Sequence, residues 1–323
     1  MRVVPFTADH TDAWDRLVET APMATFLHTR RFLSYHGDRF KDASVLLFDE
    51  QKTARGVLPA ALDPENPVRV ISHPGATYGG LVHDGRLNGQ RAHEAMAAIC
   101  ANYARQGIRA LLYKPVPYIY HRSPSADDIW AIAELGAKRV AGDLSCAIDL
   151  RGRRSPSQRR VRSLDRAQRN EVAVSDDPGS TPAFWAVLES ALERRHSARP
   201  VHTLDEIEEL QSRFPDEIRP VVAVHRGNVV AGTVLFMTAR VWHTQYLAAS
   251  EEGMAVSALD VVIEHCIEKA VAAGRRYFDF GISVGAERRR LNAGLYRFKA
   301  EFGGGGVVYE QYEHLLASDD LSS

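Results

Sequence analysis

The sequence predicts an α+β (mixed α/β) protein made of two similar halves, each a mixed, mostly antiparallel sheet flanked by helices. The first reason is length, because 323 residues exceed what one hydrophobic core usually holds. The second is a break in composition near the middle of the chain. The third is that the same order of strands and helices occurs on both sides of that break.

The composition break is the stretch Arg151-Gly-Arg-Arg-Ser-Pro-Ser-Gln-Arg-Arg, which has no apolar side chain. Gly, Pro and Ser between periodic segments are typical of a connection. We therefore expect an N-terminal domain over residues 1–152 and a C-terminal domain over residues 153–316. The polar residues 317–323 are expected to form a flexible tail.

Each half reads as several strands, then a helix, a capping glycine and one more strand. In the first half, strands are expected at 43–48, 55–62, 68–72 and 110–113, with a helix at 90–106. In the second, strands are expected at 218–224, 229–237, 241–248 and 277–280, with a helix at 255–273. A doubly wound nucleotide-binding fold would alternate strand and helix from its start, so this order argues against one.

Composition narrows the classes of function. Lys and Arg (40) balance Asp and Glu (41), and the net charge of -1 gives no global field toward DNA or an anionic membrane. The chain has no apolar run of membrane-spanning length and no signal peptide. Three scattered cysteines favour reduced thiols in the cytoplasm. The histidines show no metal-ligand spacing, and there is no GxSxG or Walker loop, so we expect no metal site.

Strand 241–248 carries polar side chains where a central strand should be apolar. Alternation would place His243 and Gln245 on one face, and Thr244 and Tyr246 on the other. Buried polar groups need partners or a ligand. Two interpretations stay open, a satisfied core histidine with a loop-bonded glutamine, or a substrate cleft.

Asp279 and Lys299 are the other candidates for chemistry. Asp279 ends an apolar strand and could orient an ammonium group or accept its proton, or else cap backbone amides. Lys299 lies in an amphipathic stretch, where it could stabilise an oxyanion or simply be a surface lysine.

Eight arginines lie between Arg151 and Arg169, and Asp165 is the single acidic residue among them. Such a run either grips phosphate, with Arg159 and Arg160 as our candidates, or is a solvated basic face.

Several stretches resemble the FemABX-like, peptidyltransferase-related GNAT family, in the branch that acylates amino groups of nucleotide-linked amino sugars. They span residues 24–312 and occur in the same order. They are Phe26-Leu-His-Thr-Arg, Tyr35-His-Gly-Asp-Arg-Phe, Ser72-His-Pro-Gly-Ala-Thr-Tyr-Gly-Gly, Tyr113-Lys-Pro-Val-Pro-Tyr-Ile-Tyr-His, Arg199-Pro-Val-His, His243-Thr-Gln-Tyr, Phe278-Asp-Phe-Gly-Ile-Ser, and Leu291-Asn-Ala-Gly-Leu followed by Lys299 and Phe302-Gly.

The resemblance implies two tandem GNAT (acyl-CoA N-acyltransferase) folds and a set of cleft residues. Lys299 matches the lysine that the peptidyltransferase relatives place near the acyl carbonyl, and His243 and Asp279 complete the expected catalytic group. The expected substrate-binding residues, taken from the matching stretches of both halves, are Tyr78, Lys114, His121, His202, Gln245, Tyr246, Ser283 and Asn292. His243, Asp279 and His202 all remain candidates for the proton acceptor.

The chain also departs from the family pattern. Ser283-Val-Gly replaces the Ser-Thr-Glu of the amino-sugar branch, which leaves the acceptor open. Ser250-Glu-Glu-Gly-Met-Ala replaces the usual pyrophosphate loop of GNAT enzymes, and its two glutamates are expected to repel phosphate.

The first functional hypothesis is an N-acyltransferase that forms an amide bond by direct attack of a primary amine on an acyl thioester. The donor would be acyl-CoA or an acyl carrier protein, with no tightly bound cofactor, and the acceptor an amino sugar or a secondary-metabolite intermediate in a biosynthetic pathway. The alternative is an aminoacyl-tRNA-dependent peptidyltransferase, which the arginine run favours. A third is a non-catalytic tandem GNAT binding module.

Overall fold

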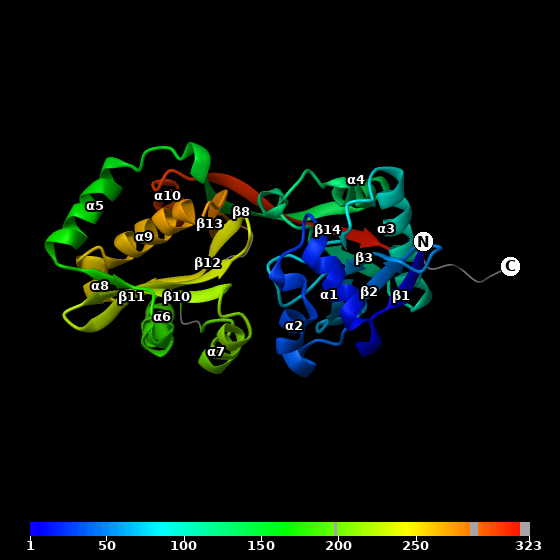
Figure 1. The fold of residues 1–323 in the computed structure, drawn as a ribbon, viewed down its shortest axis with the longest axis horizontal. Coiled ribbons are helices and arrows are strands. Elements are labelled where there is room, and N and C mark those ends of the chain that lie inside the picture. The colour runs from blue at the N-terminus through cyan, green and yellow to red at the C-terminus, as the bar shows by residue number, and fades with distance from the viewer. Residues whose placement is uncertain (197–198, 285–289, 317–323) are drawn as a thin grey trace. The chain divides into compact units, whose positions relative to one another are not determined.

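The computed structural model describes residues 1–196, 199–284 and 290–316 and divides the chain into two compact units (Figure 1). One unit is Met1–Gly142 together with Val308–Ser323, and the other is Asp143–Val307. The division falls between residues 142 and 143, within strand β8 (Lys138–Asp149), rather than near residue 152. Strand β14 (Gly305–Leu315) returns the chain to the first unit, and the expected tail lies outside the described residues.

The first unit contains two groups of strands. One is an antiparallel sheet in the order β1-β2-β3-β6, made of β1 (Arg2–Pro5), β2 (Val45–Phe48), β3 (Ala54–Leu58) and β6 (Val82–His83). The other follows the order β4-β5-β7-β14, with β4 (Ala61–Asp63), β5 (Asn66–Ile71) and β7 (Ala110–Tyr113), where β5 and β7 are parallel. The strand expected at 55–62 is therefore split at Pro59-Ala60, where proline has no amide hydrogen for a ladder.

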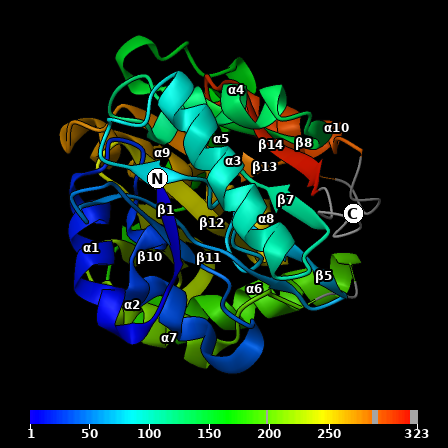
Figure 2. The same ribbon diagram turned by 90° about the vertical axis from the view of Figure 1, so that its right-hand side faces the viewer.

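Four helices complete the first unit, and Figure 2 brings α3 toward the viewer. They are α1 (Thr11–Thr20), α2 (Arg30–Leu33), α3 (Gln90–Arg105) and α4 (Asp127–Glu134). The core of this unit joins the apolar face of α3, including Met96 and Ile99, to strand residues such as Leu47 and Leu111. Short 3-10 turns occur along the whole chain at Ala8–His10, Phe26–His28, Ser34–Arg39, Tyr118–Tyr120, Leu150–Gly152 and Pro178–Ser180.

The second unit is a mixed sheet with helices on both faces. Its strand order is β8-β13-β12-β11-β10-β9, with β9 (Ala173–Ser175), β10 (Ile218–His225), β11 (Asn228–Met237), β12 (Val241–Ala249) and β13 (Tyr277–Ile282). Figure 1 shows α5 (Gln158–Arg169) and α9 (Ala258–Ala272) over one face, and α6 (Thr181–His196) and α7 (Leu204–Arg213) over the other. Two short helices, α8 (Glu251–Ala255) and α10 (Ala293–Ala300), complete the unit. The predicted fold class is confirmed.

Helix α9 anchors the core of the second unit because its apolar residues recur with the helical period. Val262, Ile263, Cys266 and Ile267 are buried against the sheet and against aromatic residues that include Phe278. The helix ends before Gly274, whose φ of +69° is easily adopted without a side chain.

Two β-bulges lie next to each other where β12 and β13 part. The strands pair in parallel through His243 opposite Asp279. On β12, Val234 faces Tyr246 and Leu235 faces Thr244, so Gln245 is an extra residue and the predicted alternation over 241–248 breaks there. On β13, the register with β8 shifts by one residue between Asp279 and Ile282, at Gly281, whose φ is +72°. Bulges re-aim side chains, and these two shape the site described below.

Gly232→Ala is expected to destabilise the protein, because β11 and α6 approach closely at this glycine. An added Cβ would lie 2.7 Å from the ring of Phe184 and 2.9 Å from the carbonyl oxygen of Val221. Overpacking of this kind costs about 1–3 kcal/mol, which urea unfolding of the full chain would measure. Gly152→Ala is the control, since nothing lies within 4 Å of its added Cβ. Equal free energies of unfolding for the two variants would contradict the prediction.

Candidate active site

Asp279 is a fully buried carboxylate whose two oxygens are both engaged. Its Oδ2 lies 2.8 Å from His243 Nδ1. Its Oδ1 accepts hydrogen bonds from Ser145 Oγ at 2.5 Å and from the Gly281 amide at 3.2 Å. Because a carboxylate only accepts, we assign the proton of His243 to Nδ1, which leaves Nε2 with a free lone pair. The His243 side chain is 11% exposed, against 0% for Asp279, so the imidazole is the member of the pair that solvent or a substrate can reach.

Lys299 lies behind the bulge of β13. Its ammonium donates to the carbonyl oxygens of Gly281 at 2.9 Å and Ile282 at 2.8 Å, and the residue is only 4% exposed. The surface-lysine interpretation is therefore wrong. Burial lowers the pKa of Lys299 to about 8, while the charge of Asp279 opposes that shift. The lysine thus remains mostly cationic near neutral pH.

Ser283 and Asn292 are brought together next to this cluster. The Asn292 amide donates to the Ser283 carbonyl at 2.9 Å, and Asn292 Oδ1 caps α10 by accepting from the Leu295 amide at 3.0 Å. Ser283 is 1% exposed, and its Oγ has no hydrogen-bond partner among the described residues. A buried hydroxyl of this kind can form a hydrogen bond with a substrate.

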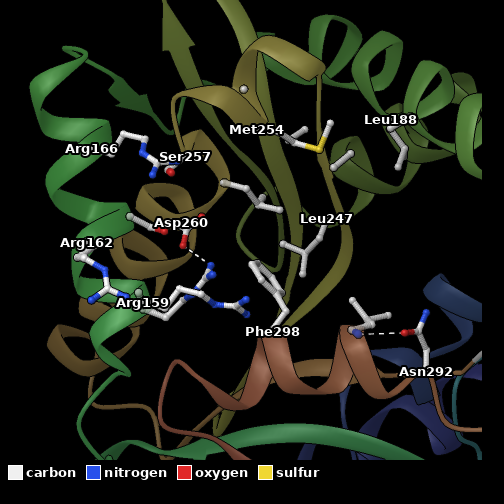
Figure 3. Close-up of a pocket in the computed structure, with 18 of the residues that line it drawn as sticks. Arg159, Arg162, Arg166, Leu188, Leu247, Met254, Ser257, Asp260, Asn292 and Phe298 are labelled. Carbon is white, nitrogen blue, oxygen red and sulfur yellow. Dashed lines mark hydrogen bonds and ion pairs between the residues drawn. The ribbon is translucent and has the colours of Figure 1, made fainter.

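A cavity of about 990 Å³ opens in the second unit between α5, α6, α9, α10 and the end of β12 (Figure 3). Much of its wall is apolar and includes Leu188, Leu247, Met254, Leu259, Leu295 and Phe298. Its polar border includes Arg159, Arg162, Arg166, Ser257, Asp260 and Asn292. Asn292 connects this cavity to Ser283 and, through the bulged strand, to Asp279. The arrangement suits a long, largely apolar substrate arm that carries an anionic group.

Comparison with known proteins assigns a domain type to part of the chain. Residues 151–300 match the family model described as an acetyltransferase (GNAT) domain, which covers most of the second unit. This part of the chain is therefore a GNAT-like domain. No curated protein matches the chain in sequence.

Solved structures share the fold of this chain over nearly its whole length. FemX is 11% identical, with 98% of each chain covered and a TM-score of 0.70. The C-terminal domain of a putative lysylphosphatidylglycerol synthetase from Agrobacterium fabrum is 12% identical, with 97% of this chain and 93% of that chain covered and a TM-score of 0.60. A tandem GNAT protein from the clavulanic acid biosynthesis pathway is 14% identical, with 99% of each chain covered and a TM-score of 0.51. The expected FemABX-like, tandem GNAT fold is confirmed.

The arginines of α5 differ in their contacts, and some of them form ion pairs with nearby carboxylates. Arg160 is 6% exposed, forms an ion pair with Asp260 and lies 4.8 Å from the ring centre of Phe298. Its charge is thus neutralised, which argues against the phosphate-binding role expected for it. Arg159 reaches the cavity but pairs with Glu301 at 2.7 Å.

Sequence reasoning missed Arg162 and Arg166 as cavity residues. Within the described part of the chain, neither has an ion-pair partner. Their spacing of four residues on a helix was the signal that could have found them.

Glu251 and Glu252, which follow β12, do not line the cavity. Glu251 pairs with Arg194 at 3.3 Å, and Glu252 lies 2.6 Å from His225 Nδ1. Helix α8 begins with Ser250, which caps it by accepting from the Gly253 amide at 3.0 Å. Both acids have partners and neither lines the cavity, and the expected repulsion of phosphate at this loop stays a prediction.

His202 and Tyr246 form a pair of their own in the second unit. His202 Nδ1 lies 2.5 Å from the Tyr246 hydroxyl, and burial raises the pKa of Tyr246 to about 12. Gln245, the bulged residue, also hydrogen-bonds to Tyr246, and Trp185 contacts its ring edge-on at 5.1 Å between centres. His202 is thus held by Tyr246, whereas Asp279 engages His243.

The expected site residues of the first half lie in the first unit, and each has local partners. Tyr78 donates to Thr25 Oγ1 at 3.2 Å, and Lys114 donates to the His73 carbonyl at 3.1 Å and to that of Ala76. His121 Nε2 lies 2.9 Å from the Val116 carbonyl. Their substrate-binding role stays a prediction.

Two general features can be stated for the described residues. No group of three or more His, Cys, Asp and Glu side chains is placed to hold a metal ion there. No helix in this part of the chain has the length and apolar character needed to cross a bilayer.

Lys299→Met is expected to remove a pH-dependent part of the free energy of unfolding. Because burial lowers the pKa of Lys299 from 10.5 to about 8, the unfolded chain binds a proton between these values that the folded chain does not. Wild-type stability should therefore rise relative to the variant as pH increases from about 8 to about 10, by at most about 3 kcal/mol. Denaturant unfolding of both proteins across this range would measure it.

Lys138→Met, at an exposed position of β8, is the control and should give a pH-independent difference from wild type. If the difference between wild type and Lys299→Met stayed flat or fell with pH, Lys299 would not titrate as its burial implies.

Proposed function

We propose that the second unit transfers an acyl group from a thioester donor to a primary amine by direct attack. The observation that carries this proposal is the His243–Asp279 pair, in which a buried carboxylate leaves His243 Nε2 free as a base. The GNAT fold supports a direct transfer between two bound substrates. Holding both reactants in one cleft then supplies much of the rate acceleration.

His243 would accept the proton of the attacking amine at Nε2. Asp279 and Ser145 are positioning residues in this scheme, because Ser145 orients the carboxylate and the carboxylate orients the imidazole. Histidine suits the role because its ordinary pKa lies near neutral pH. The new N–C bond forms as the C–S bond breaks, and the proton that His243 accepted passes to the departing thiolate.

Lys299 would stabilise negative charge on the acyl oxygen. Two of its N–H groups donate to backbone carbonyls, so an ammonium group has a third to offer. A cation held in a mostly buried position is worth more to an oxyanion than one in water.

The donor would lie in the 990 Å³ cavity. Acyl-CoA and a carrier protein both present their thioester on a phosphopantetheine arm. The apolar wall suits that arm, and Arg162 and Arg166 suit its phosphate. An amino sugar or another small primary amine would be the acceptor.

Aminoacyl transfer from charged tRNA is the second candidate. The arginine-rich α5 favours it, because guanidinium groups bind phosphate of any origin.

A donor panel would separate the two candidates. We expect the purified chain to acylate an amine from acetyl-CoA or an acetylated carrier protein, and we expect added ribonuclease to leave the yield unchanged. Product mass over a panel of amino sugars and simple amines is the measurement. Transfer only from charged tRNA, with loss on ribonuclease treatment, would replace the first candidate with the second.

Asp279→Asn is expected to lower kcat by about 10²–10⁴, because an amide can no longer hold His243 as a base. The acid limb of the pH profile of kcat/KM should change as well, which a purely structural role would not cause. Asp216→Asn, at a side chain 85% exposed, is the control and should keep wild-type rates. An Asp279→Asn enzyme with an unchanged rate and pH profile would remove His243 from the mechanism.

A further inference from the structure

Helix α5 carries a row of arginines on one face. Arg162, Arg166 and Arg169 follow one another at four and three residues, so their side chains project from the same side of the helix. All three are exposed, and Asp165 is the single acid in the helix. We call these three residues the arginine stripe.

Asp165 is the one acidic residue on the side of the helix that carries the stripe, three residues after Arg162 and four before Arg169. Within the described part of the chain, no carboxylate forms an ion pair with any of the three, whereas Arg159 and Arg160 pair with Glu301 and Asp260. Arg169 contacts only the backbone carbonyl of Asp165, at 3.3 Å. Like charges one turn apart destabilise a helix, so this arrangement is unfavourable until an anionic partner covers it.

The stripe begins at the cavity and continues away from it. Arg162 and Arg166 belong to the cavity border, and Figure 3 shows Arg166 pointing toward Ser257 at the start of α9. Arg169 does not line the cavity and lies at the far end of α5. Arg162 and Arg169 lie about 10 Å apart along the helix axis. Because Arg169 is outside the cavity lining, a small molecule confined to the cavity would not contact all three charges.

We propose that the arginine stripe docks an acidic helix of an acyl carrier protein, whose phosphopantetheine arm delivers the acyl group into the cavity. This inference rests on the proposed thioester-dependent transfer and names its donor. Acidic side chains of the carrier meet Arg166 and Arg169, and the phosphodiester that begins the arm lies at Arg162 and Arg166. The arm and its acyl group then follow the apolar wall formed by residues such as Leu247 and Phe298.

The cavity lining favours a protein-borne donor over RNA. Single-stranded nucleic acid binds by stacking successive bases on aromatic rings, whereas Phe298 is the single aromatic residue among the described lining residues. RNA-binding proteins also spread positive charge over a broad surface, and this chain has a net charge of -1. Because the three arginines lie along one side of α5, a second helix packed alongside it can contact all of them.

The test is direct binding of a fluorescein-labelled, acetylated bacterial acyl carrier protein to the full chain, followed by anisotropy. We expect Arg169→Glu to weaken binding about 10-fold, and we expect added salt to weaken wild-type binding, because both act on complementary charge. Arg105→Glu, at an exposed arginine in the last turn of α3, changes net charge equally and should leave the Kd unchanged. Equal binding by wild type and Arg169→Glu, or no binding at all, would overturn the proposal.

Rates of acyl transfer distinguish the carrier-protein docking proposal from the proposed thioester-dependent transfer. Arg169→Glu should lower kcat/KM about 10-fold with the acetylated carrier protein but leave the rate with acetyl-CoA unchanged, because CoA has no protein to dock. Thioester transfer that Arg169→Glu does not affect would refute the docking surface and leave the proposed function standing. A labelled single-stranded RNA that binds more tightly than the carrier and is lost in Arg169→Glu would assign the stripe to RNA instead.

Discussion

The buried carboxylate of Asp279 is the interaction on which the second unit depends. An ionised group with no solvent exposure is costly unless every lone pair finds a donor. Here the donors come from three separate elements, namely His243 on β12, Ser145 on β8 and the backbone of the β13 bulge. The need to satisfy one side chain therefore sets the register of three neighbouring strands, and the same requirement fixes the orientation of the imidazole.

The bulges on β12 and β13 open the sheet next to this buried carboxylate and so form the site. If β12 and β13 were regular, their pairing would continue past His243 and Asp279 and leave no opening between the two strands. The extra residue Gln245 and the left-handed conformation of Gly281 end the pairing instead. The carbonyls freed at the β13 bulge are then bound by Lys299, so the lysine supports the opening while keeping its charge close to the reacting groups.

Sequence reasoning predicted the central strands of each half, the helices over 90–106 and 255–273 and three polar residues of one cluster, because hydrophobic period and an acid at a strand end are local signals. It did not find Ser145, which lies on a strand 134 positions earlier than Asp279 and looks like any buried serine. It also chose Arg160 over Arg162, since nothing in a row of arginines says which one faces a buried acid. The bulge at Gln245 was missed because it depends on what lies across the sheet, whereas the split at Pro59 had a local signal in the proline itself. Where sequence and structure disagree most, the deciding partner is far along the chain.

The return of β14 to the first unit has a consequence for the order of events during synthesis. Strand β7 pairs with β14, which the ribosome makes only after the whole second unit. Until then β7 is an uncovered edge, and exposed edges invite pairing with other chains. The second unit is continuous in sequence and can complete its sheet as soon as it emerges. The first unit is begun first and finished last, so a chain interrupted just after residue 307 would hold a complete second unit and an incomplete first unit.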